Sequence, residues 1–118
     1  MPSDRPADRF REIVEEIDFI DDTLNGLDFQ TFCRDKLKRH AIERAFAIIS
    51  EAAVKLGDNA GRYAPDIPWR DIRGLGNFIR HEYDGVDYTT LWEVWEQSLP
   101  DLREASVSAV AQLDAPDS

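Results

Sequence analysis

Two rows of apolar side chains between residues 29 and 56 constrain the fold of this chain more than any other feature. Their members recur every three or four positions, the spacing that places side chains on one face of an α-helix. One row is Leu37, Ala41, Ala45, Ile48 and Ala52, and the other is Ile42, Phe46, Ile49, Ala53 and Leu56. A helix with so wide an apolar arc needs neighbours on several sides. We therefore predict a helix from Phe29 to Leu56, ended by Gly57, in the middle of a bundle.

The segments on either side of this helix can cover it. An apolar stripe predicts a helix from Ala7 to Leu24, ended by Asn25-Gly26. The stripe consists of Phe10, Ile13, Val14, Ile17, Ile20 and Leu24. Residues 58–67 are polar and contain a glycine and a proline, so we expect a loop there. Pro68 can then open a third helix at its first position. The residues on one face of this helix would be Trp69, Ile72, Gly76, Ile79 and Tyr83.

Two more helices are expected after a turn at Asp84-Gly85. Asp87 is a suitable N-cap for the fourth helix. The side chains of this helix that we expect to form core are Leu91, Trp92, Val94 and Trp95. Pro100 ends it, and Ser98 with Asp101 resembles a capping box for a last helix that ends near residue 113.

No segment alternates between apolar and polar residues over the length of a strand. The chain is therefore predicted to be all-α, an antiparallel bundle of four to five helices. Its 118 residues suit one domain over residues 1–118. We expect an ordered core from residue 7 to 113 and a loose tail from 114 to 118.

The net charge of −10 argues against a protein that coats nucleic acid by bulk electrostatics. The distribution is uneven. Residues 34–40 hold four cations against one carboxylate, a local charge of +3, and residues 69–83 hold three against two, a local charge of +1, so the remainder carries −14. Each of these two patches can hold a phosphate. On charge alone, solvated helix faces are the simpler interpretation, and the basic run Arg34–Arg39 with His40 can be either a guide for RNA or ordinary surface.

We expect no secretory signal, because no apolar run follows the first residues, and no apolar run approaches the roughly 18 residues that a spanning helix needs. Its one cysteine, Cys33, excludes an intrachain disulfide and a cysteine-based metal site. His40 and His81 lie too far apart in the sequence to form a metal-ligand motif. These features predict a cytoplasmic protein with no metal and no cofactor.

The densest group of chemically capable residues is the segment from Arg73 to Tyr83. In a continuous helix, Arg73, Asn77 and His81 recur every four residues and drift only about 40° per step, while Arg80 returns to within about 20° of Arg73. Gly74 and Gly76 each cost about 1 kcal/mol against alanine inside a helix, which suggests close approach of another backbone or a ligand.

This composition suits phosphate chemistry on RNA. An imidazole with an unperturbed pKa of about 6.5 can exchange a proton at neutral pH. A guanidinium can hold the extra negative charge of a five-coordinate phosphorus. The alternative is that His81 bonds a backbone carbonyl at a helix end, where the helix dipole favours it. Composition alone favours that alternative. Glu51, on the second helix, is likewise expected to form an i,i+4 ion pair with Lys55 rather than to act in catalysis.

Over about residues 10–104 the chain resembles the HepT-like ribonucleases of the HEPN superfamily. The similar pieces are Ile48–Ala53, Pro68-Trp69, Asn77–Tyr83, Val86-Asp87 and Leu91-Trp92. The family motif is an arginine, a polar residue, a short spacer and then His-x-Tyr. Asn77, His81 and Tyr83 match the polar residue, the histidine and the tyrosine.

The resemblance implies a metal-independent endoribonuclease that acts as the toxin of a toxin–antitoxin pair, with His81 as its acid–base residue. It implies a homodimer that brings two motifs into one cleft. It also implies a nucleotidyltransferase antitoxin that attaches AMP to Tyr83, which would add bulk and negative charge and block RNA. Neither DNA nor a membrane is an expected partner.

The sequence departs from the family at position 76, where the motif arginine is replaced by Gly76. Arg73 or Arg80 can take its place, either in the same chain or across the dimer. The alternative is a catalytically silent binding module that acts through a nucleotidyltransferase partner or a bound nucleotide. An acidic helical interaction protein without nucleotide chemistry is a third alternative, which the order of the motifs disfavours.

Overall fold

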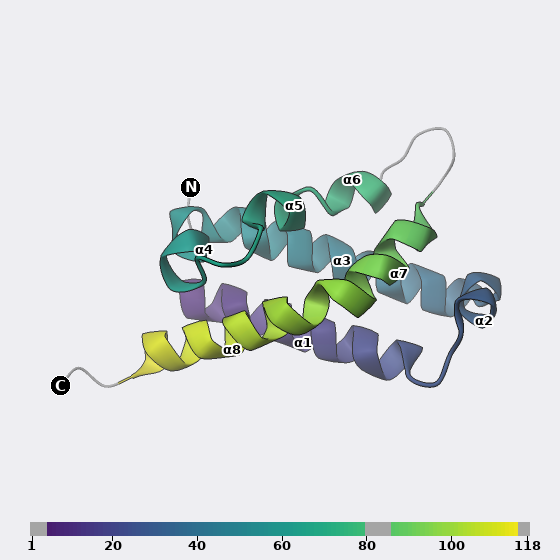
Figure 1. The fold of residues 1–118 in the computed structure, drawn as a ribbon, viewed down its shortest axis with the longest axis horizontal. Helices are drawn as coiled ribbons and strands as arrows, with labels where there is room; N and C mark the ends of the chain where they lie inside the picture. The colour runs from purple at the N-terminus through teal and green to yellow at the C-terminus, as the bar shows by residue number, and fades with distance from the viewer. Residues whose placement is uncertain (1–4, 80–85, 116–118) are drawn as a thin grey trace.

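The computed structural model describes residues 5–79 and 86–115, and these fold into helices without any strand, as predicted. Three long helices form the body of the bundle and lie side by side (Figure 1). They are α1 (Pro6–Leu24), α3 (Lys36–Leu56) and α8 (Leu99–Asp114). Shorter helices cover the ends and one edge. Within this part of the chain, no helix is long and apolar enough to cross a membrane.

The core lies between α1, α3 and α8. The predicted helix over 7–24 is confirmed, and of its stripe all members except Val14 are buried. The buried side chains of α3 are Ile42, Ala45, Phe46, Ile49, Ala52, Ala53 and Leu56, together with Ser50. Leu37, which we expected in the apolar wall, is 84% exposed. It belongs to the first turn of α3, at the margin of the apolar arc, so its periodicity did not lead to burial.

The predicted helix over 29–56 is wrong at one position, because Asp35 divides it into α2 (Phe29–Arg34) and α3. The backbone of Asp35 leaves the helical region, and its carboxylate accepts a hydrogen bond of 3.0 Å from the Lys38 N–H. Asp28 caps α2 in the same way through Thr31. Aspartate favours such capping over the helix interior because its side chain competes for backbone donors. The break lets α2 turn Phe32 into the core.

The predicted loop over 58–67 is also wrong, because its first part forms α4 (Asp58–Tyr63). Gly57 ends α3 with φ of +55°, a conformation that glycine adopts at little cost, and the chain reverses there. Ala60 and Ala64 are then buried, and Ala64 accepts a 2.8 Å hydrogen bond from the Trp69 indole. Burial of these two small residues explains why a polar segment is helical.

Asp87 caps α7 (Tyr88–Gln97) as predicted, and α8 begins at Leu99. Of the four α7 side chains expected in the core, Leu91 is buried and the other three are partly buried against it. The capping box at Ser98 does not form, because Ser98 has helical dihedral angles and its side chain makes no capping bond. Helix α8 continues to Asp114, whose carboxylate is bonded to Arg11 of α1. Residues 116–118 of the expected tail lie outside the described residues.

Candidate functional site

The third helix, predicted to be continuous from Pro68, is interrupted between Arg73 and Gly76. The structure has α5 (Trp69–Arg73), then a turn, then the single turn of α6 (Gly76–Ile79). Gly74 ends α5, and its carbonyl accepts a 3.0 Å bond from the Asn77 N–H, so the backbone tightens to three-residue turns here. The shared face that we expected for Arg73 and Asn77 required a continuous helix, and that part of the prediction is wrong.

The atoms nearest to Gly74 belong to its own helix, α5, and to the Asn77 side chain, and not to the backbone of another element. A Cβ at this position would have its nearest neighbour, the Arg70 carbonyl oxygen, at 3.4 Å, which is ordinary van der Waals contact. Gly74 also has a negative φ. The expected close approach of another backbone is therefore wrong at Gly74, where the glycine instead weakens the helix locally.

Arg73 connects α5 to the carboxyl end of α3. Its guanidinium donates to the carbonyl of Gly57 at 2.9 Å and to that of Ala53 at 3.3 Å. In return the Ser50 hydroxyl donates to the Arg73 carbonyl at 2.7 Å. Carbonyls in the last turn of a helix lack partners within the helix, and a positive charge there is favoured by the helix dipole. The side chain of Arg73 is thus held by α3 rather than presented to solvent.

Gly76 is buried against α3, whereas Asn77 is exposed. A small cavity of about 60 Å³ lies beside this contact and is lined by Gly76 and Ile79 of α6 and by Ala47, Ser50 and Glu51 of α3. The expected pair of Glu51 with Lys55 is not the one that forms. Glu51 lies 3.9 Å from Arg44, which is seven residues and about two helical turns earlier, and both side chains are largely exposed. The position of the missing motif arginine therefore faces a carboxylate on α3.

Arg80, His81 and Tyr83, with the predicted turn at Asp84-Gly85, lie outside the described residues. Before this segment, Ile79 lines the cavity against α3, and Phe78 accepts a 3.0 Å backbone bond from Asp87, which follows the segment. Phe78 and Asp87, which stand on either side of the segment in the sequence, are therefore neighbours in space.

The return point is fixed to α3 by Tyr88. Its hydroxyl donates to the Glu43 carboxylate at 2.7 Å, and the Arg39 guanidinium stands 5.5 Å from the ring centroid. Burial, followed by the bond to Glu43, raises the pKa of the Tyr88 phenol, so it remains a donor at neutral pH. Tyr88, Glu43 and Arg39 were not among the residues predicted from the sequence. The i,i+4 spacing of Arg39 and Glu43 was visible, but their common partner comes from α7.

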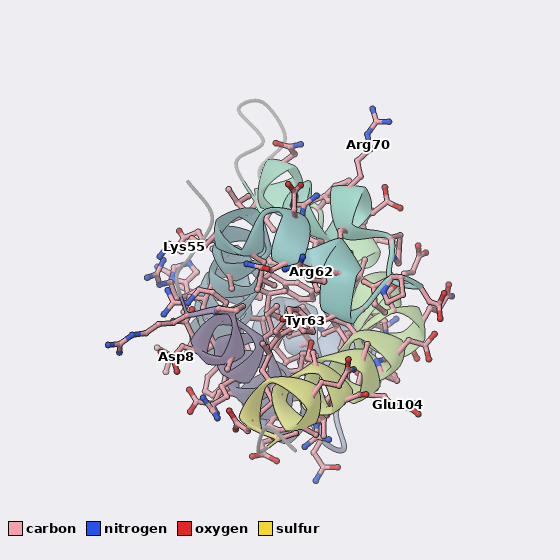
Figure 2. The ribbon with its side chains drawn as sticks, turned by 90° about the vertical axis from the view of Figure 1, so that its left-hand side faces the viewer. Asp8, Lys55, Arg62, Tyr63, Arg70 and Glu104 are labelled. Carbon is pink, nitrogen blue, oxygen red and sulfur yellow. The ribbon has the colours of Figure 1, made fainter. Side chains whose placement is uncertain are left out.

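A second, larger cavity of about 600 Å³ lies between the Ala64–Pro68 loop and the junction of α7 with α8. Its charged lining is acidic and consists of Asp66, Asp101 and Glu104. Figure 2 looks at this end of the molecule, where Glu104 projects from α8. Carboxylates repel phosphate, so this cavity does not suit a nucleic acid. The described part of the chain contains no cluster of three residues able to hold a metal ion.

Comparison with known proteins gives consistent matches. A family model described as "Ribonuclease HepT-like" matches residues 13–109. A protein of Thermococcus cleftensis named "Probable ribonuclease HepT" is 32% identical over 81% of this chain and 87% of its own length. A protein of Caldanaerobacter subterraneus, named as a candidate RNase, is 30% identical over 91% of this chain and 95% of its own. No solved structure gives a significant match.

Proposed function

This chain belongs to the HepT-like ribonuclease family, and on that premise we propose that it is a metal-independent endoribonuclease, the toxin of a toxin–antitoxin pair. The observation that carries the proposal is the family match over residues 13–109, which includes the whole segment from Asn77 to Tyr83. The matched residues include two features that separately are weak evidence for a ribonuclease site. These are the α3–α6 contact at Gly76 and the histidine five residues later in the sequence.

In the proposed reaction His81 takes the proton of a ribose 2′-hydroxyl while the 2′-oxygen attacks the adjacent phosphorus. The bond from phosphorus to the 5′-oxygen then breaks, and that oxygen takes a proton from the imidazolium of His81 as it leaves. The products are a 2′,3′-cyclic phosphate and a 5′-hydroxyl. Asn77, exposed on α6, would orient the substrate or the imidazole.

The guanidinium that offsets the charge of the phosphorane is assigned to Arg80. Arg73 was the other candidate, but its hydrogen bonds to the α3 carbonyls favour a positioning role. A homodimer would bring the Arg80 of one protomer within reach of the His81 of its partner.

Cleavage of mixed cellular RNA by the purified protein, with EDTA present, tests this proposal. We expect the native chain to cleave and His81→Ala to lose cleavage by at least about a hundredfold, the lower range for a general acid–base residue. Cleavage that is unchanged in His81→Ala would refute the assignment. Mass spectrometry of the starting protein shows whether Tyr83 already carries AMP.

Regulation follows from the same segment. We propose that a nucleotidyltransferase antitoxin attaches AMP to Tyr83 and so places a negative charge beside the site, which repels RNA. Tyr83→Phe should prevent the mass increase in the presence of the antitoxin and ATP, and Tyr63→Phe on α4 is the matched control that should still be modified. Modification that persists in Tyr83→Phe contradicts the proposal.

A second candidate function is a catalytically silent binding module, which the buried Gly76 favours. Gly76→Arg distinguishes the two. An arginine cannot fit within a cavity of about 60 Å³ and would extend past Glu51 toward solvent. If Gly76→Arg gains cleavage that the native chain lacks, the native protein is the silent module. If the native chain cleaves RNA, the arginine is dispensable and the module is excluded.

A further inference from the structure

Two cationic side chains and one imidazole form an exposed row on the amino-terminal half of α3. They are Lys36, His40 and Arg44, which we call the α3 row. They are spaced four residues apart, so successive members are about 6 Å apart along the helix axis and turn by only about 40°. All three are exposed. Arg44 has a weak contact with Glu51 at 3.9 Å, and its positive charge also acts on Glu16 of α1. Because the Arg44–Glu51 pair is exposed, replacing it with a contact from Arg44 to a phosphate costs little.

The α3 row lies where the charge of the chain reverses. Residues 34–44 carry five lysines or arginines against two carboxylates, a local charge of +3. Because the net charge of the chain is −10, all other residues together carry −13. A polyanion can approach so acidic a protein only where the local potential is positive. Cations at the opposite end do not form such a row: Figure 2 shows Lys55, Arg62 and Arg70 projecting from three different helices.

The α3 row also leads toward the candidate site. Along the same face of α3, the next residues after Arg44 are Ala47 and Glu51, which form the wall opposite Gly76 and Ile79. On the adjoining face, Arg39 and Glu43 hold Tyr88, where the chain returns from the motif. The row therefore runs beside both points at which the motif segment is attached to α3.

We propose that Lys36, His40 and Arg44 bind successive phosphates of single-stranded RNA and guide one flank of the substrate to the site. This inference rests on the proposed ribonuclease function. Lysine and arginine pair with phosphate through charge, and an imidazole N–H can donate to a phosphate oxygen. Leu37, 84% exposed beside the row, offers an apolar surface to a ribose or base. Contacts of this kind are independent of base sequence.

The test compares Lys36→Ala/Arg44→Ala with the matched control Lys55→Ala/Arg62→Ala, which removes two exposed cations at the other end of the molecule. Both pairs are made in His81→Ala so that RNA is not consumed, and circular dichroism checks folding. Binding of a labelled single-stranded RNA is followed by fluorescence anisotropy over a range of salt concentrations. Loss of two phosphate contacts should reduce the slope of log K against log salt by about 1.4 and weaken binding about tenfold at low salt. The control should shift both only slightly.

With His81 restored, the α3 row variant should raise KM for RNA cleavage and leave kcat near its native value, because the lost contacts are equal in ground and transition states. If both double variants bind and cleave alike, the α3 row is not an RNA surface, while the ribonuclease proposal stands. If the row variant alone loses binding of the antitoxin and keeps RNA binding, the face is a protein surface and the inference is wrong. If the native chain neither binds nor cleaves RNA, the proposed function and this inference fail together.

Discussion

Replacement of Arg73 by alanine separates a structural role from a catalytic one. The guanidinium donates two hydrogen bonds to carbonyls at the carboxyl end of α3, at 2.9 Å and 3.3 Å. A hydrogen bond from a charged donor contributes about 1.5–3 kcal/mol, and the longer of these two is worth less. The positive charge near the helix end adds about 0.3–1 kcal/mol. We expect Arg73→Ala to lower the free energy of unfolding by about 2–3 kcal/mol.

For a chain of this length, that loss corresponds to a fall in Tm of about 10 °C, since each kcal/mol shifts Tm by about 4 °C. Differential scanning calorimetry measures it directly. Arg70→Ala is the matched control, because Arg70 lies on the same helix and is exposed, so the expected change is within about 0.5 kcal/mol. Arg73→Lys keeps the charge but not the forked donors, and should lie between the two.

The same variant is informative in a cleavage assay performed well below its melting temperature. If Arg73 positions α5 and does not touch the phosphate, cleavage should fall only severalfold. An Arg73→Ala variant that has the Tm of the native protein and yet loses cleavage by more than about a thousandfold would refute the structural role. A loss of that size is typical of a removed transition-state contact.

Two further predictions concern stability. The Asp87 carboxylate accepts hydrogen bonds from the Thr90 N–H at 3.0 Å and from the Thr90 hydroxyl at 2.7 Å. Asp87→Ala should therefore lower the free energy of unfolding by about 1 kcal/mol, measured as a lower urea midpoint with an unchanged m value. An unchanged midpoint would mean that the cap is not stabilising. Burial, then repulsion by Glu15, raises the pKa of Glu16 above its unfolded value of 4.5, so its charge disfavours folding above that pH. Glu16→Gln should therefore be more stable than the native chain at pH 7, with the gain lost as the pH falls below 4.5; a gain that persists at acid pH would point to packing instead.

Where helices were predicted correctly, the signal was local. The stripe from Phe10 to Leu24 has the period of one helix, and the core needs only its apolar face. Asp87 caps α7 with an amide three residues away, a contact within its own turn. Patterns of this kind are complete within a few residues, so they can be recognised without knowledge of the fold.

The misassigned segments depend on distant partners or on a choice between local alternatives. Asp35 could stay within a long helix or cap a new one, and the burial of Phe32 against α7 accompanies the second choice. Residues 58–63 become helical where Ala60 and Ala64 enter the core. A polar composition reports exposure of most side chains but does not show that two small ones are buried.

The sequence by itself determined the all-helical class, the α1 stripe, the Asp87 cap of α7 and the order of the family motifs, because each depends on spacing along the chain. Only the tertiary structure decided that Arg73 binds the end of α3, that Glu51 faces Gly76 of α6, and that Tyr88 is held by Glu43. These pairings join residues up to 45 positions apart. A hydrogen bond or ion pair requires its two groups to be within a few ångströms, and packing of separate helices sets that distance.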